Sequence, residues 1–587
     1  MRHFWKKAVT LACVVALAAG CGGANNNGAA GTVDTEKVDT TLAKGSKVFE
    51  GATVIELSDE EITVDGSVIS NDEESAVYAA KDIVFYLEGQ GIAYGEGAES
   101  DGHSQADADA HTVVHITKPG TYAVSGTLSA GQIAIDLGKD AKNDPEAVVT
   151  LILNGVDIKC SVAPAVIFYN VYECSSSDTE DAVKDVDTTT AGANVLIADE
   201  SVNNVNGAYV ARIYKPESVE LSADGTEVLE AKKLHKYDAA FYSKTSMNMN
   251  GDELGNGVLN IIATNEGLDS ELHLTINGGN INILSGNDGI NTNEDEVSVT
   301  TVNGGTLKIK VSGATGEGDG IDSNGWLVIN GGTVISEACS FSMDSGIDSD
   351  MGIHINGGTV IATGNMLDSI SESTQNYAVF SFTGTQEAGE TYTLKNASGE
   401  VVFTYTPGND FANMIVSSEK LVAGTYTLWQ GETQLAASVG SAMGGFFGGF
   451  GGQMPGGMEF PEGMEMPEGM QFPGGGEMPD MGSFEGGEMP DFGSFEESQM
   501  PEGMYRPEKG EMPDMQLPEG IEKPEGMGRP VEGGETSGFG GMPSGMPGGG
   551  NGFGGMMGGM QGNAELSTEI VITDGGNYFN NVSVVTK

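Results

Sequence analysis

An Asn-Gly-Gly tripeptide recurs four times in the middle of the chain at a nearly constant spacing. Its asparagines are Asn277, Asn303, Asn330 and Asn356, which are 26, 27 and 26 residues apart. Each tripeptide follows a short apolar run and precedes a run of alternating character, such as Thr306–Val311. A fixed period of this length is typical of solenoids, in which each coil buries its apolar face only against its neighbours. The repeat therefore predicts an all-β chain folded as a parallel β-helix.

Stacking of the coils also predicts which side chains form the core. Successive coils pair strand on strand at roughly 4.8 Å, so equivalent residues lie one above another. Two buried rows are expected, the first of Ile276, Val302, Ile329 and Ile355, and the second of Ile283, Ile309 and Ile335. The four asparagines are expected to form an internal amide ladder. Both glycines of each tripeptide are expected at φ > 0, a conformation that a Cβ would resist.

An Asp-rich loop recurs at another phase of the same repeat. Its isoleucines, Ile290, Ile321 and Ile347, are expected to point inward, so that their polar neighbours meet on one outer edge of the coils. Carboxylates held so close repel unless they are protonated or bridged, and Ca²⁺ with its all-oxygen ligand shell suits such a row. The candidate calcium ligands are Asp269, Asp288, Asp319, Asp322, Asp344, Asp348 and Asp350. The alternative is that each Asp-Gly only forms a turn and its charge is solvated.

The net charge limits the kinds of partner. The chain has 85 Asp and Glu residues against 27 Lys and Arg residues, which gives a formal charge of -58. A protein this acidic cannot hold nucleic acid through phosphate contacts. Its expected partners are cations, and through them acidic ligands.

The first residues are typical of an export signal. Basic residues precede the apolar stretch Ala8–Ala19, which is too short to span a bilayer comfortably. Small residues then lead to Cys21, as in the lipobox of bacterial lipoproteins. We therefore expect export, cleavage after residue 20 and lipidation of Cys21, with the protein anchored by its lipid at the extracellular face of the cell membrane. The alternative is an ordinary cleavage site with an incidental cysteine.

Composition and strand patterns divide the rest of the chain. The N-terminal segment has two expected strands, at Thr53–Leu57 and Ile83–Leu87. Further along the chain, the thiols of Cys160 and Cys174 could either form a disulfide or remain free. The expected segments are a signal peptide at 1–20, a flexible tether at 21–45, a β-rich segment at 46–110, the parallel β-helix at 111–371, a small antiparallel β-sheet domain at 372–441, a disordered insertion rich in Gly, Met, Pro and Glu at 442–562, and a C-terminal strand segment at 563–587.

Catalysis has little support among the residues. No Ser-His-Asp, His-Glu-x-x-His, phosphate-loop or zinc pattern is present. Lys244 lies at the phase of the Asp-rich loops and is the one weak candidate for a catalytic base. A lone lysine on an outer strand face is more often simply solvated.

The order of these features resembles a family of bacterial carbohydrate-binding β-helix lipoproteins, known from a clostridial surface protein that binds cellulose and polygalacturonate. The resemblance covers most of residues 110 to 440 and depends on Gly120–Thr127, Leu151–Ile158, Asp238–Lys244, the Asn-Gly-Gly coils and the appended sheet. It implies a right-handed parallel β-helix, bound calcium, and binding of cellulose or acidic pectic sugars. The insertion at 442–562 departs from the family pattern.

Three functions are therefore consistent with the sequence. The leading one is noncatalytic, calcium-dependent binding of polysaccharide, either acidic or cellulosic, at the bacterial cell surface. The second is a polysaccharide lyase that cleaves an acidic glycan. The third is a structural adhesin or envelope spacer.

Overall fold

The structure is a computed structural model that describes residues 42–440 and 565–584. All of these residues belong to one compact unit of almost entirely β structure. The predicted signal peptide, the lipidation site Cys21, nearly all of the tether and the insertion at 442–562 lie outside the described residues. The helical elements within them are α1 (Gln105–Ala110) and four 3-10 turns: η1 (Glu99–Asp101), η2 (Ala141–Asn143), η3 (Thr179–Asp181) and η4 (Pro216–Ser218).

One ladder of strands forms an eight-stranded sheet, which we call the small sheet. Its order is β25-β22-β19-β16-β9-β7-β5-β4, and all neighbours are parallel except β4 and β5. The strands are β4 (Val77–Ala80), β5 (Thr112–Ile116), β7 (Gly131–Asp136), β9 (Val166–Asn170), β16 (Ala239–Ser243), β19 (Glu266–Ser270), β22 (Ile290–Thr292) and β25 (Ile321–Ser323).

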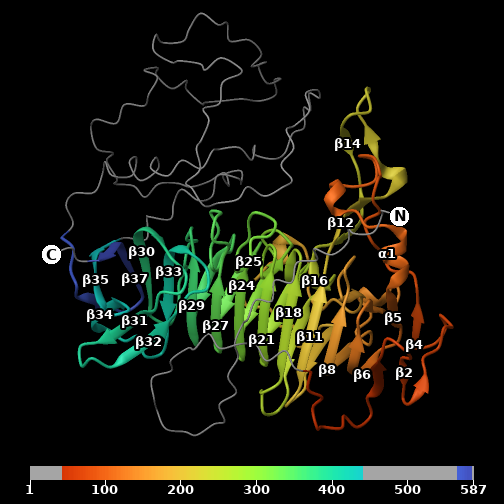
Figure 1. Cartoon of the computed structure of the whole chain (residues 1–587), viewed down its shortest axis with the longest axis horizontal. Helices are drawn as coiled ribbons and strands as arrows, with labels where there is room; N and C mark the ends of the chain where they lie inside the picture. The colour runs from red at the N-terminus through yellow and green to blue at the C-terminus, as the bar shows by residue number, and fades with distance from the viewer. Residues whose placement is uncertain (1–41, 441–564, 585–587) are drawn as a thin grey trace, which may run out of the picture. The chain divides into compact units, whose positions relative to one another are not determined.

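Two further parallel ladders belong to a 25-stranded mixed sheet, because β6 (Gly120–Leu128) and β8 (Val149–Lys159) are long enough to take part in both. The first ladder continues through β10 (Ala193–Ile197), β17 (Met247–Gly251), β20 (His273–Ile276), β23 (Val299–Val302), β26 (Trp326–Ile329) and β28 (Gly352–Ile355). The second continues through β11 (Val202–Gly207), β18 (Val258–Ala263), β21 (Asn280–Ser285), β24 (Thr306–Val311), β27 (Thr333–Glu337) and β29 (Thr359–Gly364). From β16 to β27 the chain enters the small sheet and these two ladders in rotation, and strands of the second ladder lie side by side in Figure 1.

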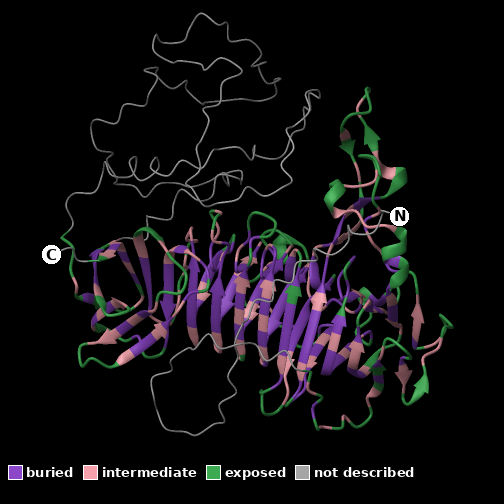
Figure 2. Cartoon of the chain, in the orientation of Figure 1, coloured by how far each residue is buried: buried purple, intermediate pink, exposed green. Residues whose placement is uncertain are grey.

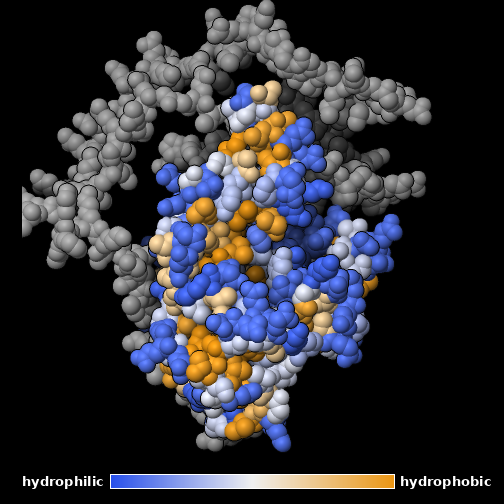
Figure 3. All heavy atoms as spheres, turned by 90° about the vertical axis from the view of Figure 1, so that its right-hand side faces the viewer, coloured by the Kyte–Doolittle hydropathy of each residue, from blue (hydrophilic) through white to orange (hydrophobic). Residues whose placement is uncertain are grey.

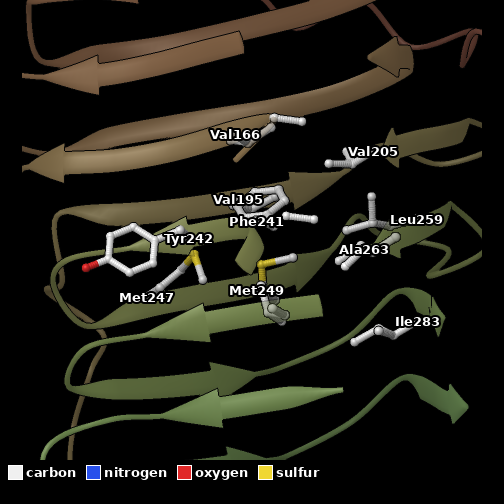
Figure 4. Close-up of a cluster of buried hydrophobic side chains, with 14 of the residues drawn as sticks. Val166, Val195, Val205, Phe241, Tyr242, Met247, Met249, Leu259, Ala263 and Ile283 are labelled. Atoms are coloured by element: carbon white, nitrogen blue, oxygen red, sulfur yellow. The ribbon is translucent and has the colours of Figure 1, made fainter. Parts of the chain in front are cut away.

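Side chains from all three ladders meet in one core. Phe241 of β16, Met249 of β17 and Leu259 of β18 are fully buried and belong to the same cluster (Figure 4). The first predicted row is confirmed, since Ile276, Val302, Ile329 and Ile355 are in register and buried.

The second predicted row is wrong at its last member. Ile283 and Ile309 are in register, but the next residue in that register is Ser336, whereas Ile335 pairs with Lys308 and Ile361. Ile335 therefore faces away from the core of the coils. It is nevertheless buried, because it packs with the C-terminal strands in a second apolar cluster.

The amide ladder exists, but it is not internal. Each asparagine donates one Nδ2–H to the Oδ1 of the preceding one at 2.9–3.0 Å, starting from Asn250. Asn277, Asn303 and Asn330 are exposed, because they follow the last inward residue of each strand.

Only the second glycine of each tripeptide has φ > 0, for example +81° at Gly305. The first glycine is required for a different reason, which is close approach between coils. A Cβ at Gly304 would lie 2.8 Å from the Asn277 carbonyl oxygen.

The C-terminal strands extend the mixed sheet. β33 pairs with β29 and β30, and β37 pairs in parallel with β30 and antiparallel with β35. The predicted domain at 372–441 is thus mixed rather than purely antiparallel, and the segment after the insertion supplies two of its strands. The strands are β30 (Tyr377–Gln386), β31 (Tyr392–Asn396), β32 (Val401–Tyr405), β33 (Phe411–Ser417), β34 (Gly424–Gln430), β35 (Thr433–Val439), β36 (Ile570–Ile572) and β37 (Gly576–Val584).

Two smaller antiparallel excursions flank the ladders. β1 (Thr53–Leu57) joins β6 in parallel and leads into a short hairpin of β2 (Thr63–Val64) and β3 (Ser67–Val68), whereas the predicted strand at Ile83–Leu87 is irregular. The second excursion, between β11 and β16, contains β12 (Val210–Tyr214), β13 (Glu220–Leu221), β14 (Val228–Glu230) and β15 (Lys233–Tyr237). Its tip is largely exposed, whereas the ladders are largely buried (Figure 2).

The surface is mixed in polarity (Figure 3) and the described cysteines are unpaired. The face in Figure 3 mixes hydrophilic and hydrophobic residues. Cys160, Cys174 and Cys339 are free thiols, and burial raises the pKa of Cys160 to about 11. No helix among residues 42–440 and 565–584 is long and apolar enough to cross a membrane.

Candidate functional site

The Asp-rich loops are held in phase by the small sheet. Ile290 of β22, Ile321 of β25 and Ile347 are fully buried and fix the phase of each coil. The polar residues that follow them fall into register: Asp269 pairs with Asn291, and Asn291 pairs with Asp322. The Asp348 amide continues this row, since it donates to the Ile321 carbonyl at 2.7 Å. We call Asp269, Asn291, Asp322 and Asp348 the acidic row.

The acidic row is more buried than the sequence predicts. Asp269 has no exposed surface and Asn291 is 8% exposed, although an outer edge was expected. Asp322 and Asp348 are half-buried, and Asp350 is exposed. Burial makes each unneutralised charge far more costly than at an open edge.

Three other candidate ligands use part of their capacity to join coils. Asp288 accepts a hydrogen bond from the Asp319 amide at 2.7 Å, and Asp319 accepts one from the Ser345 amide at 2.5 Å. Asp344 accepts one from the Gly318 amide at 2.6 Å. These carboxylates thus have a structural role in capping the neighbouring coil, and each of these bonds engages a single carboxylate oxygen.

Several buried oxygens of the row have no hydrogen-bond partner. They are Oδ2 of Asp269, Oε2 of the adjacent Glu266, Oδ1 of Asn291 and Oδ1 of Asp348. An unpartnered buried oxygen is costly, and the hard, oxygen-only donor set is the one Ca²⁺ prefers. These oxygens are therefore of the type that binds a hard divalent cation.

Burial and mutual repulsion raise the pKa values of carboxyl groups in and beside the acidic row. Burial, followed by repulsion from Asp368 and Asp322, raises the pKa of Asp348 to about 8. Burial and neighbouring aspartates likewise raise the pKa values of Asp322 and Asp368 to about 6. Burial and nearby carboxylates also hold the pKa of Asp288 well above its usual range.

At the other end of the row a lysine lies among the acids. The Lys236 ammonium is 3.8 Å from Asp238. Burial alone would lower the pKa of Lys236, but three carboxylates outweigh that effect and raise it; they are Glu271, Asp269 and Asp238. Glu271 also accepts a hydrogen bond of 2.6 Å from the Tyr242 hydroxyl.

The seven predicted ligands do not converge on one centre. Within the described parts of the chain, no three His, Cys, Asp or Glu side chains form a group that could hold a metal ion as they stand. The structure instead distributes them along the small sheet and beyond its last strand, β25. It brings together Asp322, Asp348 and Asp350 with Asp368 at one end, and Asp288, Asp319 and Asp344 beside them.

Lys244 lies outside the acidic row proper. It is exposed, follows β16, and its ammonium lies 4.5 Å from the centre of the Tyr169 ring. The Lys244 amide bonds to β9, and the Glu271 amide bonds to the Ser243 carbonyl, so Lys244 and Glu271 occupy adjacent coils.

Sequence reasoning omitted three residues of the site from the ligand set: Glu266, Glu271 and Asp368. Glu266 begins β19 at the position that Asp288 and Asp319 occupy in later coils, but Gly-Leu follows it in place of Gly-Ile. Asp368 lies one coil beyond the last Asp-Gly-Ile loop, and its Oδ2 accepts a bond from the Ser349 amide at 3.0 Å. Alignment of Glu266 with Asp288 and Asp319 by phase would have found the first, whereas Asp368 already falls at the phase of the Asp-rich loops in the sequence.

The chain is similar to a family of carbohydrate-binding proteins. A family model described as "Carbohydrate-binding domain-containing protein" matches residues 110–405. Among solved structures, the polysaccharide lyase-like protein from C. thermocellum, a gadolinium derivative, is 20% identical, with 52% of this chain and 92% of that chain covered and a TM-score of 0.29. No curated protein matches.

Proposed function

The chain belongs to the carbohydrate-binding domain-containing protein family, since the family model covers half of it, and we propose that it binds acidic polysaccharide through calcium without cleaving it. The observation that carries this proposal is the set of unpartnered buried oxygens in the acidic row. Pectic glycan at the bacterial surface is the proposed ligand.

We propose two sets of calcium ligands along the acidic row. Oxygens of Asp322, Asp348 and Asp368 would supply one ligand set, and Asp269 with Asn291 would supply another. The backbone bonds to Asp288 and Asp319 keep adjacent coils at a fixed distance, so the carboxylates are positioned before any ligand arrives. When bound, calcium supplies positive charge that a sugar carboxylate can approach, which a protein of charge -58 otherwise repels.

The arrangement of the coils suits a polymeric ligand. We infer that the three parallel ladders are the faces of a right-handed parallel β-helix, because the chain enters them in rotation. On such a fold the acidic row runs across successive coils, so one extended glycan can meet several carboxylates. Anchoring through a lipid on Cys21 would present this surface outside the cell.

Affinity electrophoresis in gels containing polygalacturonate tests the proposal. We expect retardation of the wild-type chain with calcium and none with EDTA. The double variant D322N/D348N should lose the retardation, whereas D574N, which changes an exposed aspartate between β36 and β37, should keep it. Retardation that persists in EDTA would contradict calcium-dependent binding.

A lyase is the second candidate because Lys244 is exposed beside the acidic row. A lyase product carries an unsaturated end, so activity would appear as ultraviolet absorbance during incubation with polygalacturonate and calcium. We expect no absorbance. Absorbance that disappears in Lys244→Met would assign catalysis, whereas failure to bind any glycan would favour the structural adhesin.

A further inference from the structure

A polar groove lies on the first ladder, away from the small sheet. The loop between β9 and β10 folds against this ladder and is pinned there by Thr188, which is 4% exposed. The Thr188 hydroxyl donates to Asn248 Oδ1 and lies 2.7 Å from it and from Thr275 Oγ1. Asn248 Nδ2 in turn donates to the Thr188 carbonyl at 2.7 Å.

Beside this contact is a cavity of about 260 Å³. Its walls come from the loop on one side and from β17, β20 and β23 on the other. The lining residues that matter for recognition are Asp187, Thr189, Thr275, Asn277, Thr301 and Asn303. The volume is just below the roughly 300 Å³ at which pockets for drug-sized ligands begin, so it suits a single sugar ring.

The floor of the groove keeps unused hydrogen-bonding capacity. Asn277 gives one N–H to Asn250 and accepts one bond from Asn303. A primary amide has two N–H donors and two lone pairs, so each ladder asparagine retains one donor and one acceptor. The Thr301 hydroxyl makes no hydrogen bond within residues 42–440 and 565–584, and Thr301 lines the cavity together with these asparagines.

The chemistry of the lining selects a neutral ligand. No lysine, arginine or histidine contributes to the groove. Its one carboxylate, Asp187, already accepts bonds from the Thr189 amide at 3.0 Å and the Thr189 hydroxyl at 2.6 Å. The neighbouring donors and acceptors suit the hydroxyl groups of a sugar, which both donate and accept, whereas an anion would find no positive charge.

We propose that this groove is a second glycan-binding site, specific for a neutral sugar and independent of calcium. It is formed by the amide ladder at Asn277 and Asn303, the Thr301 hydroxyl and the loop that Thr188 pins. It goes beyond the proposed function, because the acidic row belongs to the small sheet and contributes none of these residues. A chain with both sites can hold a glycan that alternates neutral and acidic stretches.

Isothermal titration of the full-length chain in EDTA tests the site. Cellohexaose, xylohexaose and mannohexaose are the probes. At least one should bind, and Thr301→Val should weaken its binding roughly three- to tenfold, the effect of one lost neutral hydrogen bond. Valine keeps the shape and the β-branching of threonine, so the strand should be retained.

Thr333→Val is the matched control, since Thr333 begins β27 outside the groove. It should bind the probe as the wild type does. The groove is refuted if no probe binds in EDTA, or if the two valine variants bind equally. Retardation of Thr301→Val by polygalacturonate with calcium should be unchanged, so loss of neutral binding and failure of the acidic site remain distinguishable.

Discussion

In the absence of calcium, the free energy of unfolding of the protein should decrease as the pH rises from 5 to 7. The pKa values of Asp322 and Asp368 are raised to about 6 and that of Asp348 to about 8. A carboxyl whose pKa is higher in the folded than in the unfolded protein stabilises the fold while it is protonated. That stabilisation is complete below the unfolded pKa, near 4, and is lost as the pH rises through 6 and then 8. A salt-bridged aspartate has a lowered pKa in the folded protein, so it gives the opposite change of stability with pH.

The size of the effect follows from the shifts. A group whose pKa rises from 3.8 to about 6 loses about 1.3 kcal/mol of stabilisation between pH 5 and pH 7. Asp322 and Asp368 together then account for about 2.6 kcal/mol, and Asp348 adds about as much again. Because the three groups share their mutual repulsion, the total is about 3–4 kcal/mol. With an unfolding entropy of about 2 cal/mol/K for each of about 420 described residues, this lowers Tm by about 3–5 °C.

Calorimetry at pH 5, 6 and 7, with EDTA or with millimolar calcium, measures this prediction. In EDTA, Tm should fall over the series, and Asp348→Asn should flatten the fall because it removes one titrating group. Calcium should raise Tm most at pH 7, since the metal replaces protons between the carboxylates. A Tm in EDTA that is level or rises with pH, or that calcium leaves unchanged at pH 7, would refute the reasoning.

Two further variants test the fold. Gly289→Ala should lower Tm strongly, because the new Cβ would lie 2.1 Å from Ile309 Cγ2 and so force the coils apart, whereas Gly91→Ala, with open space around it, should have little effect in the same melting assay. Tyr405→Phe should destabilise the protein by about 1–3 kcal/mol in urea titration, because it removes the hydroxyl that donates to the buried Glu337 carboxylate; a change below 0.5 kcal/mol would contradict that role.

The period of the sequence was sufficient to predict the ladders, and single residues show where it failed. Ile276, Val302, Ile329 and Ile355 stack as predicted because strand pairing carries the repeat from coil to coil. Ile335 does not follow the rule, since β27 places serine in the inward position and leaves Ile335 to the C-terminal strands. A local pattern cannot reveal that a distant segment covers the outer face.

The site was predictable in its location but not in its environment. The phase of Asp288, Asp319 and Asp322 follows from the repeat. Their burial does not, because the repeat gives the order of the side chains and not what covers them. The groove at Thr301 was not predictable, since the loop around Thr188 reaches it across 87 residues, as the hydrogen bond to Thr275 shows.

A chain that repeats an aspartate at one phase of stacked parallel strands brings like charges to the spacing of those strands. At roughly 4.8 Å and an effective dielectric constant near 20, each such contact costs about 3.5 kcal/mol. The chain relieves this repulsion in two ways: Asn291 replaces a carboxylate, and Lys236 lies among the acids near Asp269.

In the part of the chain that the structure describes, neither an asparagine nor a lysine relieves the repulsion at the end of the acidic row formed by Asp322 and Asp348. No ion pair among the described residues involves Asp322, Asp348 or Asp368. An external cation is the remaining way to neutralise them at neutral pH, because protonation alone would require pKa values above 7 at all three positions. The strongest calcium site of the row is therefore expected there rather than near Lys236, where the chain already supplies its own positive charge.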